Sequence, residues 1–267
     1  MYKDFTALNA VLDGRGVLTL TMDNPPMNAM TRAMHAELAR IFEEVNHDPE
    51  VKVIVITGAG DKAFSAGGDI KAMAERRATM NHNSWMLGIT EARRIIYGML
   101  RLERPLIARV NGHAMGLGAT LAVYADITIM LENAKIADTH VKVGLTAGDG
   151  GALLWPLLMG FAKARRYLLT GDTMTGAQAA EYGLISTAVP DIAALDAEVD
   201  AIVNGMASGA TQAINGTKRA INLVLRKLVE GVIEEHLGGE TVTFLSEDHL
   251  EAAEAFRDKR TPEFKGR

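Results

Sequence analysis

Two glycine-rich segments carry the clearest structural signal in this chain: Ala63-Phe-Ser-Ala-Gly-Gly-Asp-Ile70 and Val110-Asn-Gly-His-Ala-Met-Gly-Leu-Gly118. Each follows an apolar stretch typical of a strand and leads toward a helix. Their glycines leave backbone N–H groups accessible to a ligand. Two such N–H groups that converge on one carbonyl oxygen form an oxyanion hole, which stabilises negative charge developing there. Either segment alone is better interpreted as a turn, so it is the pair that points to a site.

The elements around these segments predict an α/β protein that is rich in strands first and helical later. The predicted strands are Leu8–Leu12, Val17–Met22, Val51–Thr57, Leu106–Val110, Asp126–Leu131 and Ser186–Val189. The predicted helices are one beginning at Thr31, one near Lys71–Arg77, one ending near Arg101, Ala119–Tyr124, Gly150–Leu158, Arg165–Thr170, Gly176–Tyr182, Ile192–Ser208, Thr211–Val229 and Ile233–Arg257. Residues 78–88 are polar with scattered Met and Trp85, and we expect them to be mobile.

Composition excludes several classes of protein. The chain has 267 residues, 48% of them hydrophobic and 23% charged, as in ordinary soluble globular proteins. A net charge of −5 argues against general nucleic-acid binding. The absence of cysteine excludes disulfides and thiolate metal sites. The histidines show no metal-ligand spacing, and no signal or membrane-spanning stretch is evident, so we expect a cytoplasmic protein without a metal.

A dinucleotide site is the first alternative to weigh. The segment Gly58-Ala-Gly60-Asp-Lys-Ala63 follows a strand and fits the pattern G-x-G-x-x-G/A. That site requires a helix to open at once, so that its N-terminus faces the pyrophosphate. Phe64 instead begins the next glycine cluster, so we interpret this segment as a plain strand-to-loop turn.

Taken together, four segments resemble the crotonase (enoyl-CoA hydratase/isomerase) superfamily, in order and over nearly the whole chain. They are Ala63–Ile70, Val110–Gly118, Thr170-Gly-Asp-Thr-Met-Thr-Gly-Ala-Gln-Ala-Ala-Glu-Tyr-Gly-Leu184 and Phe256-Arg-Asp-Lys-Arg-Thr-Pro-Glu-Phe-Lys-Gly266. The resemblance implies the crotonase (ClpP-like) fold, a superhelix of stacked ββα turns followed by a helical region that trimerises. It implies a core over residues 1–190, a C-terminal helical region over 191–267, and a homotrimer or a dimer of trimers.

The resemblance also implies an acyl-CoA substrate and no separate cofactor. Its thioester oxygen would accept hydrogen bonds from the backbone N–H groups of Ala66 and Leu117. The coenzyme A contacts would fall on Phe64, Ala66, Gly67, Gly68, Asp69, Ile70, Gly116 and Leu117, with Lys265 and Lys259 reaching phosphates from a neighbouring subunit. A solvated basic tail is the alternative for the two lysines.

The chain departs from the family at its two catalytic glutamates. The positions that hold and activate water in family hydratases are Thr120 and His140 here. Threonine cannot act as a base near neutral pH. The stretch from Asp138 through His140 to Asp149 and Trp155 is similar to that of 6-oxocamphor hydrolase, a crotonase relative. That resemblance implies a His140–Asp149 dyad in which Asp149 fixes the tautomer of His140 and stabilises its cation.

Two reactions therefore remain open at this site. One is hydration of an enoyl-CoA with a His–Asp base, and the other is retro-Claisen hydrolysis of a β-keto acyl-CoA or a β-diketone. Leu117 stands where the camphor enzyme carries a further histidine, which favours a thioester over a free diketone. Asp138 is a rival partner for His140, because residues two apart share one face of an extended segment. Asp149 also matches the nucleophile of 4-chlorobenzoyl-CoA dehalogenase.

Two other classes of protein are weaker alternatives: a catalytically inactive binding protein and a nicotinamide-dependent dehydrogenase. The alternative role for Asp149 is to cap the helix at Gly150–Leu158, and the other histidines look like helix or loop surface. Four methionines, Met73, Met80, Met86 and Met99, flank the expected acyl pocket, where methionine equally often fills gaps in a core.

Overall fold

A computed structural model describes residues 2–70, 72 and 82–267. Its larger sheet has six strands in the order β1-β2-β3-β5-β7-β10. These strands are β1 Leu8–Leu12, β2 Val17–Met22, β3 Val53–Gly58, β5 Leu106–Val110, β7 Ile127–Leu131 and β10 Thr187–Val189. The first pair is an antiparallel hairpin, as predicted, and every later pairing is parallel.

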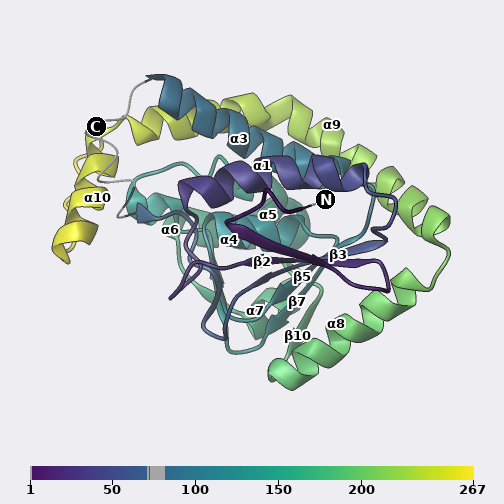
Figure 1. The fold of residues 1–267 in the computed structure, drawn as a ribbon. Helices are drawn as coiled ribbons and strands as arrows, with labels where there is room; N and C mark the ends of the chain where they lie inside the picture. The colour runs from purple at the N-terminus through teal and green to yellow at the C-terminus, as the bar shows by residue number, and fades with distance from the viewer. Residues whose placement is uncertain (1, 71, 73–81) are drawn as a thin grey trace.

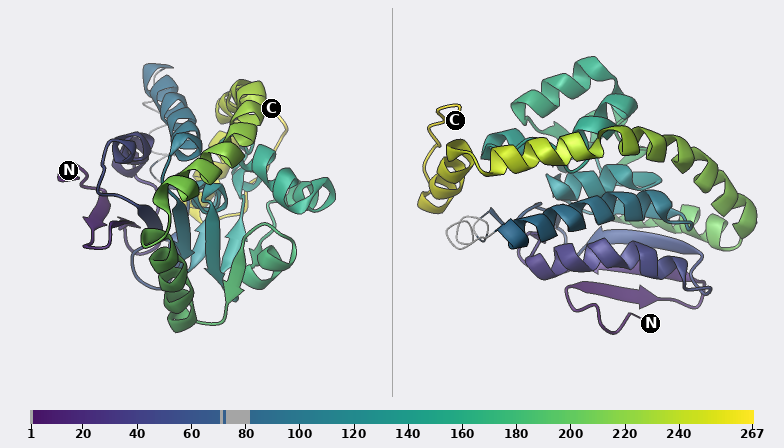
Figure 2. Two further views of the ribbon diagram at one scale, coloured as in Figure 1. Left: turned by 90° about the vertical axis from the view of Figure 1, so that its right-hand side faces the viewer. Right: turned by 90° about the horizontal axis from the view of Figure 1, so that it is seen from above.

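Both faces of the parallel strands are covered by helices, which explains why β3 is apolar throughout. Ile54 and Ile56 belong to the main core, beneath α1 Arg32–Asn46 and α3 His82–Arg101. Val53 and Val55 point to the other face, where they pack with Leu195, Val199 and Val203 of α8 Ile192–Ala207. Figures 1 and 2 show α1 and α3 side by side on one face of the sheet and α8 on the other.

A second, smaller sheet carries the glycine-rich segments. Its order is β4-β6-β8-β9, formed by Ala63–Ser65, His113–Met115, Lys135–Ala137 and Met174–Thr175. These strands have two or three residues each, too few for a periodic pattern, and the sequence did not predict them. After Gly58-Ala-Gly60 the chain enters β4 rather than a helix, so the interpretation of that segment as a turn is confirmed.

Short helical elements lie between β6 and β10 in the chain. They are α4 Leu117–Tyr124, the 3₁₀ turn η1 His140–Val143, α5 Gly151–Met159, α6 Phe161–Thr170 and α7 Gly176–Glu181. Thr31 caps α1 as predicted, because its side chain accepts a hydrogen bond from the Met34 amide. The fold is thus α/β with C-terminal helices, as predicted, and its strands form two mixed sheets.

The prediction of two helices meeting near residues 229–233 was wrong. One helix, α9, runs from Thr211 to Phe244, and α10 spans Glu247–Asp258. A Cβ on Gly231 would meet no atom within 4 Å, so this glycine forces no break, and Val229, Ile233 and Leu237 anchor the helix in the main core. The helix ends where Ser246 caps α10 by accepting from the His249 amide. Figure 2 shows α9 lying alongside α3.

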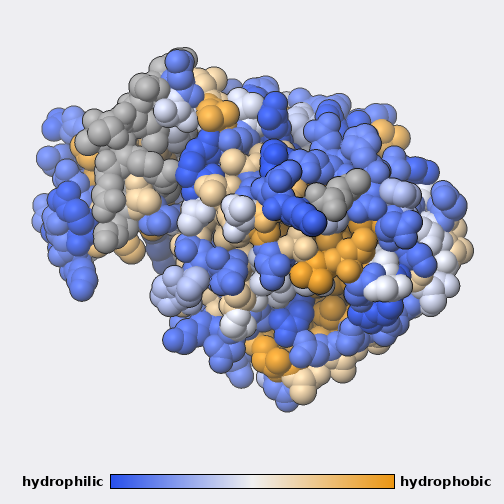
Figure 3. Space-filling view, in the orientation of Figure 1, coloured by the Kyte–Doolittle hydropathy of each residue, from blue (hydrophilic) through white to orange (hydrophobic). Residues whose placement is uncertain are grey.

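Two other predictions concern the segment before α3. The helix near Lys71–Arg77, apart from residue 72, and residues 78–81 of the expected mobile segment 78–88 lie outside the described residues. Residues 82–88, which the structure does describe, belong to α3. Among the described helices, none is both long and apolar enough to cross a membrane. The face drawn in Figure 3 is largely hydrophilic, with separate apolar patches.

The buried carboxylate of Glu37 ties α1 to the start of β1. It accepts hydrogen bonds from the Thr6, Ala7 and Leu8 amides at 2.8–3.2 Å. We expect Glu37→Ala to lower the free energy of unfolding by about 2–4 kcal/mol, because three backbone donors lose their acceptor. Denaturant unfolding measures this change. Glu43→Ala, at an exposed position of the same helix, should change it by less than about 0.5 kcal/mol.

Candidate active site

The two glycine-rich segments meet in the folded chain. Gly67 has a φ of +77°, a left-handed conformation that favours glycine. A Cβ at Gly67 would lie 2.5 Å from the Met115 carbonyl oxygen and 3.4 Å from the Gly116 Cα. A side chain here would therefore push the segments apart, and glycine at this position is what allows them to form one site.

The hydrogen bonds correct one of the two expected oxyanion donors. We expected Ala66 and Leu117, but the Ala66 amide already donates to the Met27 carbonyl at 2.9 Å. Within the described part of the chain, the amides of Gly68 and Leu117 have no acceptor. Leu117 begins α4, so its amide belongs to the first turn, which lacks intrahelical partners. Gly68 with Leu117 is therefore the better candidate pair.

A cavity of about 440 Å³ opens in front of these amides. Six of the expected substrate-binding residues line it: Ala66, Gly68, Asp69, Ile70, Gly116 and Leu117. The other three do not. Phe64 lies fully buried in the main core and Gly67 is held between the two segments. Lys265 is exposed in the tail beyond α10, and its role stays a prediction.

The far wall of the cavity comes from α3 and α9. Trp85 of α3 stacks on Phe244 of α9 with ring centroids 3.8 Å apart, and its indole N–H donates to the Thr241 hydroxyl at 3.1 Å. Ile89 and Ala92 add apolar surface. Of the four methionines, Met99 is buried in the core and Met86 is partly exposed, while Met73 and Met80 lie outside the described residues.

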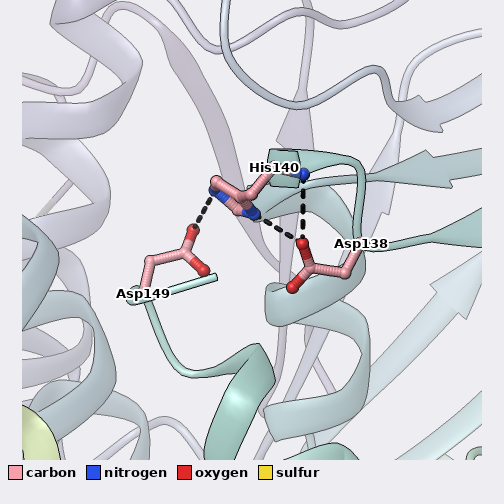
Figure 4. A group of neighbouring side chains, drawn as sticks. All are labelled: Asp138, His140 and Asp149. Carbon is pink, nitrogen blue, oxygen red and sulfur yellow. Dashed lines mark hydrogen bonds and ion pairs between the residues drawn. The ribbon is translucent and has the colours of Figure 1, made fainter. Parts of the chain in front are cut away.

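His140 lies between two carboxylates at the inner end of the cavity (Figure 4). Its Nδ1 is 2.6 Å from Asp138 Oδ1, which also accepts from the His140 backbone amide at 3.2 Å. Its Nε2 is 3.6 Å from Asp149 Oδ2. The expectation that Asp149 orients the ring was therefore wrong: Asp138, the rival partner, holds Nδ1, while Asp149 faces the nitrogen on the opposite side.

Thr120 completes this group from α4. Its hydroxyl donates to Asp149 Oδ1 at 3.1 Å, and both side chains are buried. Thr120, which the sequence resemblance matches to the first family glutamate, thus donates a hydrogen bond to the carboxylate of Asp149. Asp149 does not cap α5, because the residue before that helix is Gly150, which makes no side-chain cap bond.

Burial and mutual attraction set the protonation of the group. Burial acts to lower the pKa of His140, but the facing charges of Asp138 and Asp149 raise it well above its ordinary value. Burial acts to raise the pKa of Asp138, yet His140 lowers it overall. Burial raises the pKa of Asp149, with His140 opposing and Asp138 adding to the rise. His140 is therefore held as a cation by Asp138, and Asp149 is an unusually basic carboxylate.

Two polar groups of the cavity were missed in the sequence. Glu240 of α9 lies near this cluster, and His35 of α1 lines the cavity with its Nδ1 2.8 Å from Glu91 of α3. Glu91 also pairs with the Arg32 guanidinium. In the sequence His35 looked like helix surface. No local pattern links Glu240, in a long helix, to His140, which lies about a hundred residues earlier.

The same three side chains have the spacing of a small metal site. One donor atom each from Asp138, His140 and Asp149 lies within 4.8 Å of the other two. The closest pair, His140 Nδ1 and Asp138 Oδ1, is at hydrogen-bond distance, which suits a shared proton better than an intervening ion. We therefore treat the group as an acid–base cluster.

The fold and this site define a crotonase-type protein, in which two backbone N–H groups without an acceptor among the described residues and a cluster of titratable side chains line the same cavity. The family model described as Enoyl-CoA hydratase/isomerase matches residues 13–267. The chain belongs to that family, the class of protein that the sequence predicted.

Relatives of known name agree with this placement. Carnitinyl-CoA dehydratase from Citrobacter koseri is 32% identical over 257 residues, covering 94% of this chain and 95% of the relative. An enoyl-CoA hydratase/isomerase structure from Mycobacterium paratuberculosis has 35% identity and a TM-score of 0.88, covering 94% of this chain and 99% of that one. An enoyl-CoA hydratase from Mycobacterium avium subsp. paratuberculosis has 30% identity and a TM-score of 0.87, covering 97% and 99%.

The pairing of Asp138 with His140 can be tested without an activity assay. We expect Asp138→Asn to lower the pKa of His140, because it removes the nearest negative charge that stabilises the imidazolium. Histidine side-chain NMR titration measures the change. Asp69→Asn is the matched control, since Asp69 also lines the cavity but bonds the Ala72 amide. An unchanged His140 pKa in Asp138→Asn would contradict the assigned contact.

Proposed function

We propose that this protein adds water to, or removes it from, an acyl-CoA thioester. One observation carries the proposal: His140 Nε2 and Asp149 Oδ2 face each other at 3.6 Å in a cavity that the free Gly68 and Leu117 amides also line. This arrangement offers one acid, one base and one anion-binding position to the same small ligand. The carnitinyl-CoA dehydratase relatives support the same class of reaction.

In the direction of dehydration, Asp149 takes the α-proton of a 3-hydroxyacyl thioester. The electron pair moves onto the thioester oxygen, where the Gly68 and Leu117 N–H groups stabilise the enolate. The enolate then forms the C=C bond as the β-hydroxyl leaves, and His140 protonates that hydroxyl to give water. Hydration reverses these steps. The raised pKa of each group suits its role, because His140 arrives charged and Asp149 is a stronger base than an exposed aspartate.

The oligomeric state and the coenzyme A contacts between subunits are part of the proposed function. We propose a homotrimer or a dimer of trimers, with residues 1–190 as the catalytic core and 191–267 as the helical region at the contacts. Lys259 and Lys265 then meet the phosphates of coenzyme A bound to a neighbouring subunit. Their position in the exposed C-terminal tail supports this proposal.

Retro-Claisen hydrolysis is the second candidate, and the histidine at a glutamate position is the observation that favours it. In this reaction His140 accepts a proton from water, whose oxygen attacks the β-ketone. The C–C bond breaks to give a carboxylic acid and an enolate that the same amides stabilise, and the proton on His140 returns to the enolate carbon. This reaction requires a neutral His140 at the start, which the pKa raised by Asp138 and Asp149 disfavours at neutral pH.

Substitutions in the cluster test both candidates together. We expect His140→Ala and Asp149→Asn each to lower turnover by roughly two or more orders of magnitude, while KM for the CoA ester stays similar. Steady-state kinetics with crotonyl-CoA measures the effect, and His47→Ala, at an exposed position, is the control. Wild-type rates in both variants would exclude the dyad.

A substrate panel separates the two reactions. We expect the enzyme to hydrate crotonyl-CoA and to leave cyclic β-keto acyl-CoA esters intact, with products identified by mass and by whether the ring has opened. Ring opening without hydration would replace the first candidate by the second. A protein that retains no acyl-CoA at all would exclude both, and NADH binding would point to the dehydrogenase alternative.

A further inference from the structure

Glu240 reaches the site through a close contact between α9 and Gly148, in the loop that carries Asp149. A Cβ at Gly148 would lie 2.4 Å from the His236 carbonyl oxygen and 2.8 Å from both Cβ and Oε2 of Glu240. Only glycine at position 148 lets the helix pack this closely against the residue before Asp149. Glu240 thereby lines the same cavity as His140 and Asp149, although it lies about a hundred residues further along the chain.

The carboxyl group of Glu240 has no hydrogen-bond partner for its buried Oε2 within the described part of the chain. That oxygen lies against Gly148, so the carboxyl group meets the cavity that Glu240 lines through its other oxygen, Oε1. Burial, followed by the charge of Asp149, raises the pKa of Glu240 to about 8. Near pH 7 the side chain is therefore mostly a neutral acid, able to donate one hydrogen bond toward the cavity.

We propose that Glu240 is a specificity-determining residue that donates a hydrogen bond to an oxygen on C3 of the acyl group. The inference rests on the proposed function, because His140 and Asp149 bracket the place where that oxygen is added or removed. The cavity has apolar and polar walls, which suits such a substrate. Trp85 and Phe244 offer apolar surface to the acyl chain, while Glu240 lies with the acid–base cluster. The proposed contact favours acyl thioesters that carry an oxygen on C3 over those without one.

The charges around Glu240 are consistent with a protonated donor. Asp138 and Asp149 disfavour its ionised form, and the His140 cation opposes them. The other titratable or charged side chains that line the cavity are Arg32, His35, Asp69 and His249. Glu91 of α3 pairs with Arg32 and His35, and His236 of α9 lies beside Gly148. Because the folded-state pKa is raised, the donor is present below about pH 8 and is lost as the pH rises through that value.

Binding of two unreactive ligands tests the inference. Acetoacetyl-CoA carries an oxygen on C3, whereas butyryl-CoA does not, and neither can gain or lose water at a C=C bond. Calorimetry at pH 6.5 gives both Kd values, and mass analysis establishes that each thioester is recovered intact. If acetoacetyl-CoA is cleaved instead, its KM replaces its Kd in the same comparison. We expect the wild type to prefer acetoacetyl-CoA by roughly ten-fold.

Three variants separate a hydrogen-bond donor from a structural residue. Glu240→Ala should abolish the preference and leave butyryl-CoA binding unchanged, whereas Glu240→Gln, which still donates from its amide, should retain it. Glu235→Ala, at an exposed position of the same helix, should behave as the wild type. In the wild type the preference should fall above about pH 8, and in Glu240→Gln it should not.

The contrary results have distinct meanings. A preference that survives in Glu240→Ala, an equal loss in Glu240→Ala and Glu240→Gln, or parallel weakening of both ligands would each overturn the inference. Failure of the wild type to bind butyryl-CoA at all would instead overturn the proposed acyl-CoA function. The two failures are therefore distinguishable in one set of titrations.

Discussion

The close approach of two backbones at Gly67 and Gly116 is the constraint on which the site depends. With a Cβ at Gly67, the Met115 carbonyl would be 2.5 Å away, so the segments could not meet. Their contact places the Gly68 and Leu117 amides on one cavity. Because these donors belong to the main chain, the side chains at those positions are free to vary, and a leucine can occupy a position within a glycine motif.

A similar close approach at Gly148 brings α9 to the loop that carries Asp149. Together the two contacts assemble a ligand cavity from the start of α4, the loop around η1, and the distant helices α1, α3 and α9. The acid–base cluster then depends on burial. In water a histidine between two aspartates would be an ordinary ion pair, but here the surrounding protein strengthens each charge interaction and shifts all three pKa values.

The family membership and the altered site are compatible, because the candidate anion-binding groups are backbone amides while the candidate acid–base groups are side chains. The sequence resemblance places the two family glutamates at Thr120 and His140. In the structure Thr120 donates a hydrogen bond to Asp149, which faces His140. Asp138 holds Nδ1 of His140, which leaves Asp149 beside Nε2 in the cavity.

Local patterns in the sequence determined much of the fold. The hairpin at residues 8–22, the Thr31 cap, the uniformly apolar β3 and the two glycine-rich segments all depend on neighbours close in the chain. The short strands β4, β6, β8 and β9 were missed because two or three residues show no period. The sequence predicted two helices where α9 is one. A glycine inside a helix costs only about 1 kcal/mol, and core packing by Val229 and Ile233 offsets that cost.

Only the tertiary structure decided which groups work together. The sequence pointed to His140 and Asp149, but Asp138 binds Nδ1 because the chain turns into η1 immediately after β8. Ala66 was one of the two expected oxyanion donors, but in the fold its amide donates to the Met27 carbonyl. Glu240, His35 and Glu91 gave no signal at all. Hydrogen-bond partners and burial depend on residues far apart in the chain, whereas the periodic patterns read from a sequence are local.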